Sequence, residues 1–305
     1  MFVSDHPIIV DGVRLDTLAW GVEAADLTIG GLRSGDQVLA GLDGVVPSWD
    51  DAREPSIYAL SMFIRGTDED GLVPADRSRW GMFRENLDAL LHLFGRTSGP
   101  LDVREVVTSD PVTTDVQDAL NAPQRQAFAK VDGALAPTME PGAVGRLTVA
   151  LSLSSVYWAD VDPQTWTSGP LTTGVAHTVD TMEGGTAPVD DAVAVLTGPA
   201  TSPVVIRDAH TGAFVRLNAN VPAGQAWRVN VGTWSSRMAA GLTVDSDDTE
   251  GVSMDALTDQ GGNYPSLLRL TPTLDTGARR VSVAVDAAGM TAATTLTLSA
   301  RRKYL

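Results

Sequence analysis

The strongest constraint on the fold is a run of alternating apolar and polar residues within positions 199–238. Residues 213–219 and 227–231 both alternate with a period of two, which is the pattern of a strand with one buried face. Gly212 and Gly224 lie beside these runs, where tight turns favour a residue without a side chain. The stretch therefore predicts a meander of three antiparallel strands, on which the neighbouring segments close a sandwich.

The same pattern recurs beyond residue 170, where almost nothing favours a helix. Strands are expected at 175–181, 192–196, 203–207, 213–219, 226–232, 266–271, 280–286 and 293–300. Short strands at this spacing are typical of a jelly-roll β-sandwich. The last five residues, RRKYL, are expected to form a short basic tail.

The first part of the chain predicts β structure with one amphipathic helix. Residues 57–65 (IYALSMFIR) are apolar on both faces, as in a strand between a core and a covering element. A helix is expected over 75–94, because Pro74 and Asp76 are typical of a helix start and an apolar stripe follows. The stripe consists of Met82, Phe83, Leu87, Leu90, Leu91 and Phe94. Further strands are expected at 7–10, 27–29, 37–40, 101–107 and 146–158, and a short helix at 124–130.

Two domains are expected in a chain of 305 residues, which is long enough for two cores. Residues 160–170 combine prolines with small polar residues, a composition typical of a linker. The boundary is therefore placed between an N-terminal domain of residues 1–162 and a C-terminal domain of residues 163–305. Residues 108–142 break the periodicity and are expected to be an insertion in the first domain. The fold class is mainly β, with α+β character in the N-terminal domain.

Composition excludes several classes of function. The chain has no cysteine, so it has no disulfide, no thiolate zinc site and no cysteine nucleophile. Its net charge of −16 opposes binding to a nucleic-acid backbone. No apolar run reaches the roughly 20 residues of a membrane span, and the acidic N-terminus is unlike a secretory signal.

Candidate catalytic and metal-binding residues are few. The four histidines, His6, His92, His177 and His210, have no metal-binding spacing. Residues 245–250 (DSDDTE) are rich in carboxylates, which suits either a calcium site or a solvated acidic loop, but they do not match the EF-hand spacing. No nucleophile elbow, phosphate-binding loop or dinucleotide fingerprint is present. The sequence therefore predicts no enzyme, and no catalytic, cofactor-binding or metal-binding residue.

Four tryptophans in the second half raise a carbohydrate-binding alternative, since exposed indole rings can stack on sugars. Trp227 is in phase with the apolar residues of its strand, which indicates a core position. Trp158 and Trp166 flank the expected linker, where packing between the domains is the simpler interpretation. Trp234 follows the third strand of the meander.

The order of these parts resembles that of siphovirus distal tail proteins. The resemblance depends on the residues YW at 157–158, DPQTW at 162–166, the TG turn at 211–212 and AGQ at 223–225. It implies an N-terminal domain that assembles into a six-membered ring continuing the tail tube. It also implies a galectin-like C-terminal domain that points outward and carries other tail-tip proteins. Arginine-rich, lysine-poor composition suits a phage of an actinobacterial host.

The resemblance implies a structural protein of the virion tail tip, assembled in the host cytoplasm. Its partners would be further copies of the chain, the tail tube protein, the tail hub protein and other minor tail proteins or fibres, with DNA present only in transit. Residues 1–100 carry 16 acidic and 8 basic side chains, so we expect an acidic channel lining that repels phosphates. The alternative is a carbohydrate- or receptor-binding tail module that recognises the host envelope. A cell-wall hydrolase would need a cleft with a buried carboxylate.

Overall fold

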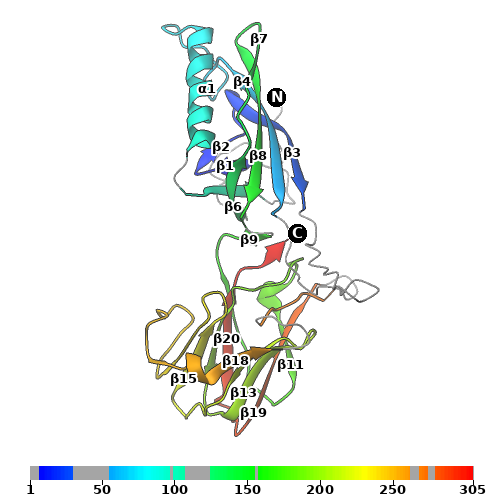
Figure 1. The fold of residues 1–305 in the computed structure, drawn as a ribbon, viewed down its shortest axis with the longest axis vertical. Helices are drawn as coiled ribbons and strands as arrows, with labels where there is room; N and C mark the ends of the chain where they lie inside the picture. Colours follow the sequence, from blue (N-terminus) through cyan, green and yellow to red (C-terminus); the bar gives the residue numbers. More distant parts are fainter. Residues whose placement is uncertain are drawn as a thin grey trace, which may run out of the picture. The chain divides into compact units, whose positions relative to one another are not determined.

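The chain divides into two compact units, Met1–Trp158 and Ala159–Leu305, and each is described by itself. The computed structural model describes residues 7–29, 55–96, 99–106, 124–154, 157–261, 268–273 and 279–304. Strands predominate in these ranges, and one α-helix is present among them (Figure 1), so the prediction of a mainly β fold is confirmed. No helix in the same ranges is long and apolar enough for a membrane span.

The N-terminal unit is an antiparallel sheet with one helix. Its strands follow the order β2-β1-β5-β6-β8-β4-β3, and β7 pairs with the beginning of β8. The elements are β1 (Ile8–Val10), β2 (Val13–Arg14), β3 (Trp20–Thr28), β4 (Ile57–Arg65), α1 (Arg79–Gly95), β5 (Leu101–Val106), β6 (Gln124–Asp132), β7 (Thr138–Glu140) and β8 (Val144–Leu153).

Helix α1 covers one face of this sheet with the predicted apolar stripe. Five of the six stripe residues are buried, and Leu91 is half-buried. On β4, every second side chain from Tyr58 to Ile64 is buried, while the other face is half-buried. The Asn86 amide of α1 donates hydrogen bonds to the carbonyls of Arg65 and Thr67, at 2.7 and 2.9 Å. These bonds join the helix to the end of the central strand.

The predicted start of the helix is wrong by about one turn. The helix begins at Arg79, and the side chain of Ser78 caps it by accepting a hydrogen bond from Gly81 N at 3.0 Å. Residues 74–77 form a separate turn, in which Arg77 N donates to Pro74 O at 3.0 Å. A serine cap satisfies an otherwise unpaired backbone donor, which explains why it marks the helix start.

The predicted short helix at 124–130 is also wrong, because this segment forms β6. β6 lies between β5 and β8, and Ala129 is opposite Leu101 on one side and Leu153 on the other. Ala127 and Ala129 are buried at a spacing of two residues. Pairing on both sides outweighs local helix propensity here. The strand expected at 37–40 and residues 108–123 of the expected insertion lie outside the described residues.

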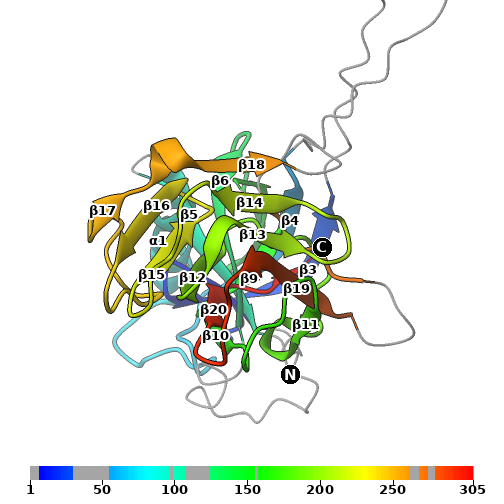
Figure 2. The same ribbon diagram turned by 90° about the horizontal axis from the view of Figure 1, so that it is seen from below.

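The C-terminal unit is a β-sandwich (Figure 2). One sheet has the strand order β10-β20-β12-β15-β16-β17, and the other has the order β11-β19-β13-β14-β18. β9 (Trp158–Asp160) begins at the division between the units and pairs with β21. The other elements are β10 (Gln164–Thr167), β11 (Ala176–Val179), η1 (Asp180–Met182), β12 (Val193–Thr197), β13 (Thr201–Asp208), β14 (Phe214–Leu217), β15 (Ala226–Asn230), β16 (Ser235–Ala239), β17 (Val252–Ser253), η2 (Asp255–Leu257), β18 (Thr258–Gly261), β19 (Val281–Ala288), β20 (Thr295–Ala300) and β21 (Lys303–Tyr304).

The predicted three-stranded meander is correct for two strands only. β13 and β14 form a hairpin in one sheet, whereas β15 pairs with β12 and β16 in the other. Both sheets bury one face in the same core, so alternation identifies the inward face and leaves the choice of sheet open. Trp227 of β15 is fully buried, as predicted, and its Nε1 donates a 2.8 Å hydrogen bond to Ser236 Oγ.

The carboxylate of Asp208 builds the turn between β13 and β14. It is fully buried, and it accepts hydrogen bonds from His210 N at 2.8 Å and Thr211 Oγ1 at 3.0 Å. It also accepts one from Thr271 N at 2.8 Å. A buried carboxylate is tolerated when its oxygens are satisfied in this way.

Both the expected linker and the expected basic tail form strands: the linker contains β10 of the sandwich, and the tail contains β21, which pairs with β9. Within 160–170, β10 pairs with β20 and places Trp166 opposite Leu298. Two prolines flank this edge strand, a position where a missing backbone N–H costs little. At the end of the chain, Tyr304 is buried, and its hydroxyl donates to Asp160 Oδ1 at 2.9 Å.

Gly66→Ala should destabilise the N-terminal unit by about 2 kcal/mol or more, measured by urea unfolding. A Cβ at this position would lie 2.0 Å from the backbone oxygen of Arg79, at the start of α1. Gly95→Ala is the control, because its Cβ would meet nothing within 4 Å. Equal stability of Gly66→Ala and the wild type would contradict the described packing of α1.

Candidate interaction surfaces

The outer edge of β3 is the first candidate surface. β3 pairs with β4 on one side, and no strand in the described ranges pairs with its other side. Its last six residues are all exposed, and the apolar side chains of Leu27 and Ile29 are 38% and 44% exposed. Unpaired backbone groups on a long edge are ready to bind another strand. A bulge after Val22 and the charges of Glu23 and Asp26 are its protective features in this part of the chain.

The face of the N-terminal sheet opposite α1 is the second candidate surface. It carries small and polar side chains, for example Ala24 opposite Ser61 and Ser61 opposite Thr148, together with the rings of Phe63 and Phe128. Its charges are of both signs, and Asp102 pairs with Arg104 at 2.8 Å. The other charged residues of this face are Asp26, Arg65, Lys130, Asp132 and Arg146.

Most acidic residues of the described N-terminal segments lie elsewhere. Six of them lie in α1 and in the preceding loop, where the Asp68 carboxylate accepts hydrogen bonds from Asp70 N and Leu72 N, at 3.1 and 2.7 Å. The acidic run at 67–71 is thus an ordered turn. An acidic channel lining stays a prediction. In the described segments, the acidic side chains are not concentrated on the open face of the sheet.

An apolar patch at the start of α1 is the third candidate surface. Trp80 is 50% exposed and packs edge-on against the buried Phe83, with ring centroids 5.7 Å apart. Met139 of β7 is 65% exposed and pairs with Gly145, where a Cβ would lie 2.9 Å from Phe83. Large exposed apolar side chains gathered in this way are typical of binding surfaces.

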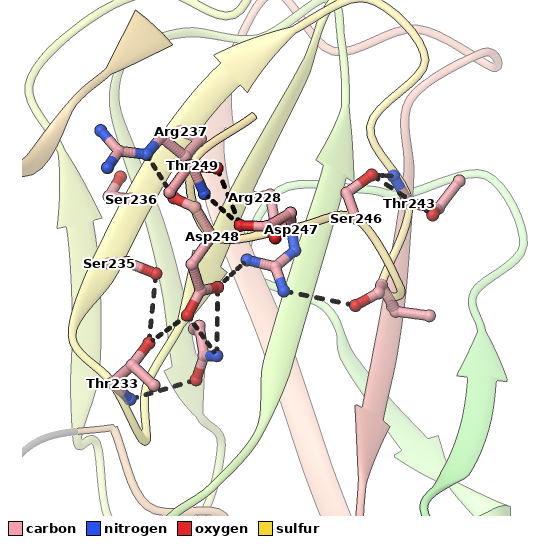
Figure 3. A network of polar contacts seen from close by, with 12 residues as sticks. Arg228, Thr233, Ser235, Ser236, Arg237, Thr243, Ser246, Asp247, Asp248 and Thr249 are labelled. Carbon is pink, nitrogen blue, oxygen red and sulfur yellow. Dashed lines mark hydrogen bonds and ion pairs between the residues drawn. The ribbon is translucent and has the colours of Figure 1, made fainter. Parts of the chain in front are cut away.

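A polar network on the C-terminal unit is the fourth candidate (Figure 3). Arg228 of β15 lies directly opposite Arg237 of β16, an arrangement in which like charges repel. Asp255 lies 3.9 Å from Arg237, and Asp248, in the loop between β16 and β17, forms an ion pair with Arg228. The carboxylate of Asp248 accepts hydrogen bonds from Arg228 Nη1 at 2.5 Å and Thr233 Oγ1 at 2.8 Å. It also accepts from Asn230 Nδ2, at 3.2 Å for the nearer oxygen, and its backbone carbonyl accepts from Arg237 Nε at 2.6 Å.

Burial alone would raise the pKa of Asp248. The hydrogen bonds from Arg228, Thr233 and Asn230 together outweigh this effect and lower the pKa to about 2. The carboxylate is therefore ionised and occupied by these donors. A calcium ion at residues 245–250 would have to compete with a guanidinium for this ligand. No group of three or more His, Asp or Glu side chains in the described ranges is placed to hold a metal ion.

The histidines are not brought together. His6 lies outside the described residues, and His92 is exposed on α1. His177 is half-buried on β11, and His210 is exposed in the turn built by Asp208. Sequence reasoning missed Arg228, Asn230 and Thr233, because nothing in their spacing shows that they meet one carboxylate about twenty residues away.

The tryptophans do not form an exposed platform. Trp158 is 4% exposed and packs edge-on against Tyr58 in the N-terminal unit, with ring centroids 5.3 Å apart. Trp166 and Trp234 pack against the core of the sandwich. The large exposed apolar residues of the described C-terminal segments are Val175, Val252 and Leu257, none of them aromatic. No observation on the described part of the sandwich therefore favours the carbohydrate-binding alternative.

Together, the single-helix sheet and the sandwich define a two-unit, mainly β protein. The solved structure of the Dit protein of phage SPP1 has this fold: its TM-score is 0.53, with 12% sequence identity, over 99% of this chain and 100% of that chain. A chain of the activated phage p2 baseplate with strontium aligns with a TM-score of 0.38 and 6% identity, over 98% of each chain. No family model and no curated protein sequence matches. The fold expected from the resemblance to distal tail proteins is confirmed.

Asp248→Asn should destabilise the C-terminal unit by about 1–2 kcal/mol at pH 7, a modest value because the side chain is 32% exposed. The folded-state pKa lies below the unfolded value, so this stabilisation is complete above about pH 4. It is lost as the pH falls toward about 2. Urea unfolding of both proteins at several pH values measures the difference. A difference that persists unchanged at pH 2 would contradict the assigned role of the carboxylate.

Proposed function

We propose that the chain is a structural component of a phage tail tip, whose copies form a ring that joins the tail tube to the distal hub. The observation that carries this proposal is the free outer edge of β3, next to the exposed side chains of Leu27 and Ile29. The shared fold supports it, since the SPP1 Dit protein is described as a paradigm of the hub adsorption apparatus in phages that infect Gram-positive bacteria. Such a role requires no catalytic residue.

Ring closure follows from head-to-tail contact between unlike surfaces. β3 lies at one end of the sheet, and the two-residue strand β2 lies at the other. Strand addition across these edges would extend the sheet from one copy to the next, with backbone hydrogen bonds supplying affinity. A constant rotation between copies closes such contacts into a ring. The resemblance to distal tail proteins suggests six copies.

The open face of the sheet suits the wall of a channel that DNA crosses. Small and polar side chains cover much of it, and acidic residues lie among the basic ones, so phosphates would meet no continuous basic stripe. We therefore infer that residues 1–162 form the ring around the channel. The sandwich of residues 163–305 would stand outside it and carry peripheral tip proteins. The virion is then the site of action, after assembly in the host cytoplasm with tube, hub and minor tail proteins.

Replacing both Leu27 and Ile29 by lysine should raise the protein concentration needed for assembly roughly hundredfold. Two apolar side chains leave the contact, and the edge becomes charged. Light scattering and negative-stain microscopy of the purified protein, with and without tube and hub proteins, measure ring formation. Val252→Lys is the control, because Val252 is 65% exposed and lies on β17 of the sandwich.

Rings in the wild type and the control, with none in the double variant, would support the proposal. A wild type that forms no ring with any of these partners would contradict the ring. Rings of unchanged stability in the double variant would contradict the role of the β3 edge.

A further inference from the structure

Exposed apolar side chains gather at one end of the N-terminal sheet. Leu72, in the loop before α1, is 65% exposed, Trp80 in the first turn of α1 is 50% exposed, and Met139 of β7 is 65% exposed. They are three of the six large exposed apolar residues in the described N-terminal segments. We call these residues and the end of the sheet that carries them the rim. Apolar side chains concentrated in this way are typical of a surface that another protein covers.

Strand register places the rim at one end of the unit (Figure 1). Arg65, the last residue of β4, lies opposite Val144, the first residue of β8, and β7 pairs with the same part of β8. Helix α1 begins beside them, because a Cβ on Gly66 would lie 2.0 Å from the backbone oxygen of Arg79. The chain continues toward the second unit from the opposite end of β8, after Leu153. The rim therefore carries neither this connection nor the exposed end of β3.

Backbone and ring contacts hold the three rim residues in place. Asp68 N donates to Leu72 O at 2.8 Å, and Leu72 N donates to the Asp68 carboxylate at 2.7 Å. The indole of Trp80 packs edge-on against the buried Phe83, and Met139 is fixed by the pairing of β7 with β8. A surface that is ordered before binding loses little conformational entropy when a partner covers it.

The rim also carries cations without an anionic partner. Arg79 precedes Trp80, and Arg84 lies one turn beyond it on the same helix; both are exposed. Neither forms an ion pair with a described residue, whereas the neighbouring Arg77 pairs with Glu85. Tryptophan, methionine and arginine are residue types enriched at the centres of protein interfaces. The partner that fits the rim is therefore a protein surface with apolar side chains and carboxylates.

We propose that the rim is the surface through which the ring stacks on the end of the tail tube. The inference rests on the proposed function. When copies join through their strand edges, the ends of the strands point along the ring axis, as in a barrel, so the rims of all copies form one annulus. The opposite end of β8 leads to the sandwich, which is proposed to carry peripheral tip proteins. The rim is thus assigned to the tube side, with carboxylates of the tube protein facing Arg79 and Arg84.

Capping of tail tubes tests the rim. Tubes assembled from the tail tube protein are mixed with the full-length chain, and negative-stain microscopy counts the capped tube ends at increasing concentrations of the chain. The double variant Trp80→Ser, Met139→Ser should need a roughly tenfold or higher concentration for the same capping, because two apolar side chains leave the contact. Phe128→Ser is the matched control, because Phe128 is 46% exposed on the open face of the same sheet.

A second variant separates binding from folding. Arg84→Glu reverses the charge of an exposed side chain and leaves the contact between Trp80 and Phe83 intact. It should also weaken capping, with a melting temperature equal to that of the wild type. Unchanged capping by Arg84→Glu and by the double variant would overturn the proposal.

Capping by the wild type and the control at equal concentrations, with weaker capping by both rim variants, would support the proposal. A wild type that caps no tube would overturn it, as would loss of hub binding in the double variant with tube capping retained. The assay needs no preformed rings, and microscopy of the chain alone shows whether rings form. Failure of the ring can therefore be distinguished from failure of the rim.

Discussion

Burial of one face of every sheet is the constraint on which this structure depends. In the C-terminal unit two sheets satisfy it for each other, so Trp227 and the apolar residues around it form a closed core. In the N-terminal unit one helix satisfies it for one face of one sheet. The other face and the outer edge of β3 stay uncovered in the described residues. The two units therefore differ in what they offer to neighbours: β3 is a nine-residue edge strand, whereas the edge strands of the sandwich have at most four residues.

The two units differ in how far their charged side chains are buried. On the open N-terminal face, ion pairs such as Asp102 with Arg104 stay near water, where each contributes little to stability. On the sandwich, Arg228 is almost fully buried opposite Arg237, and Asp248 of the loop between β16 and β17 pairs with Arg228. Asp255 lies 3.9 Å from Arg237, so each guanidinium of the opposed pair has a carboxylate beside it.

Local pattern predicted much of this fold, and its failures have physical causes. The stripe of α1 and the inward position of Trp227 follow from periodicity alone, because each depends on one element facing one core. The sheet that β15 joins depends on a crossover, and β6 depends on partners from distant parts of the chain. Residues 164–167 resembled a linker because edge strands tolerate the same prolines and polar residues as loops. The polar network around Asp248 joins β15, the turn after it and the loop between β16 and β17. The spacing of residues along the chain does not show that these three segments meet.

The open face and the free edge of the N-terminal sheet make different demands on the protein. A polar face of an antiparallel sheet can remain in contact with water indefinitely, because its side chains need no partner. A nine-residue edge strand is different, since it exposes backbone donors and acceptors together with Leu27. Natural proteins protect such edges with lysine, proline or a covering segment, and β3 contains neither lysine nor proline. An edge left in this state is either a liability or an interface. In the proposed ring, a neighbouring copy would cover this edge.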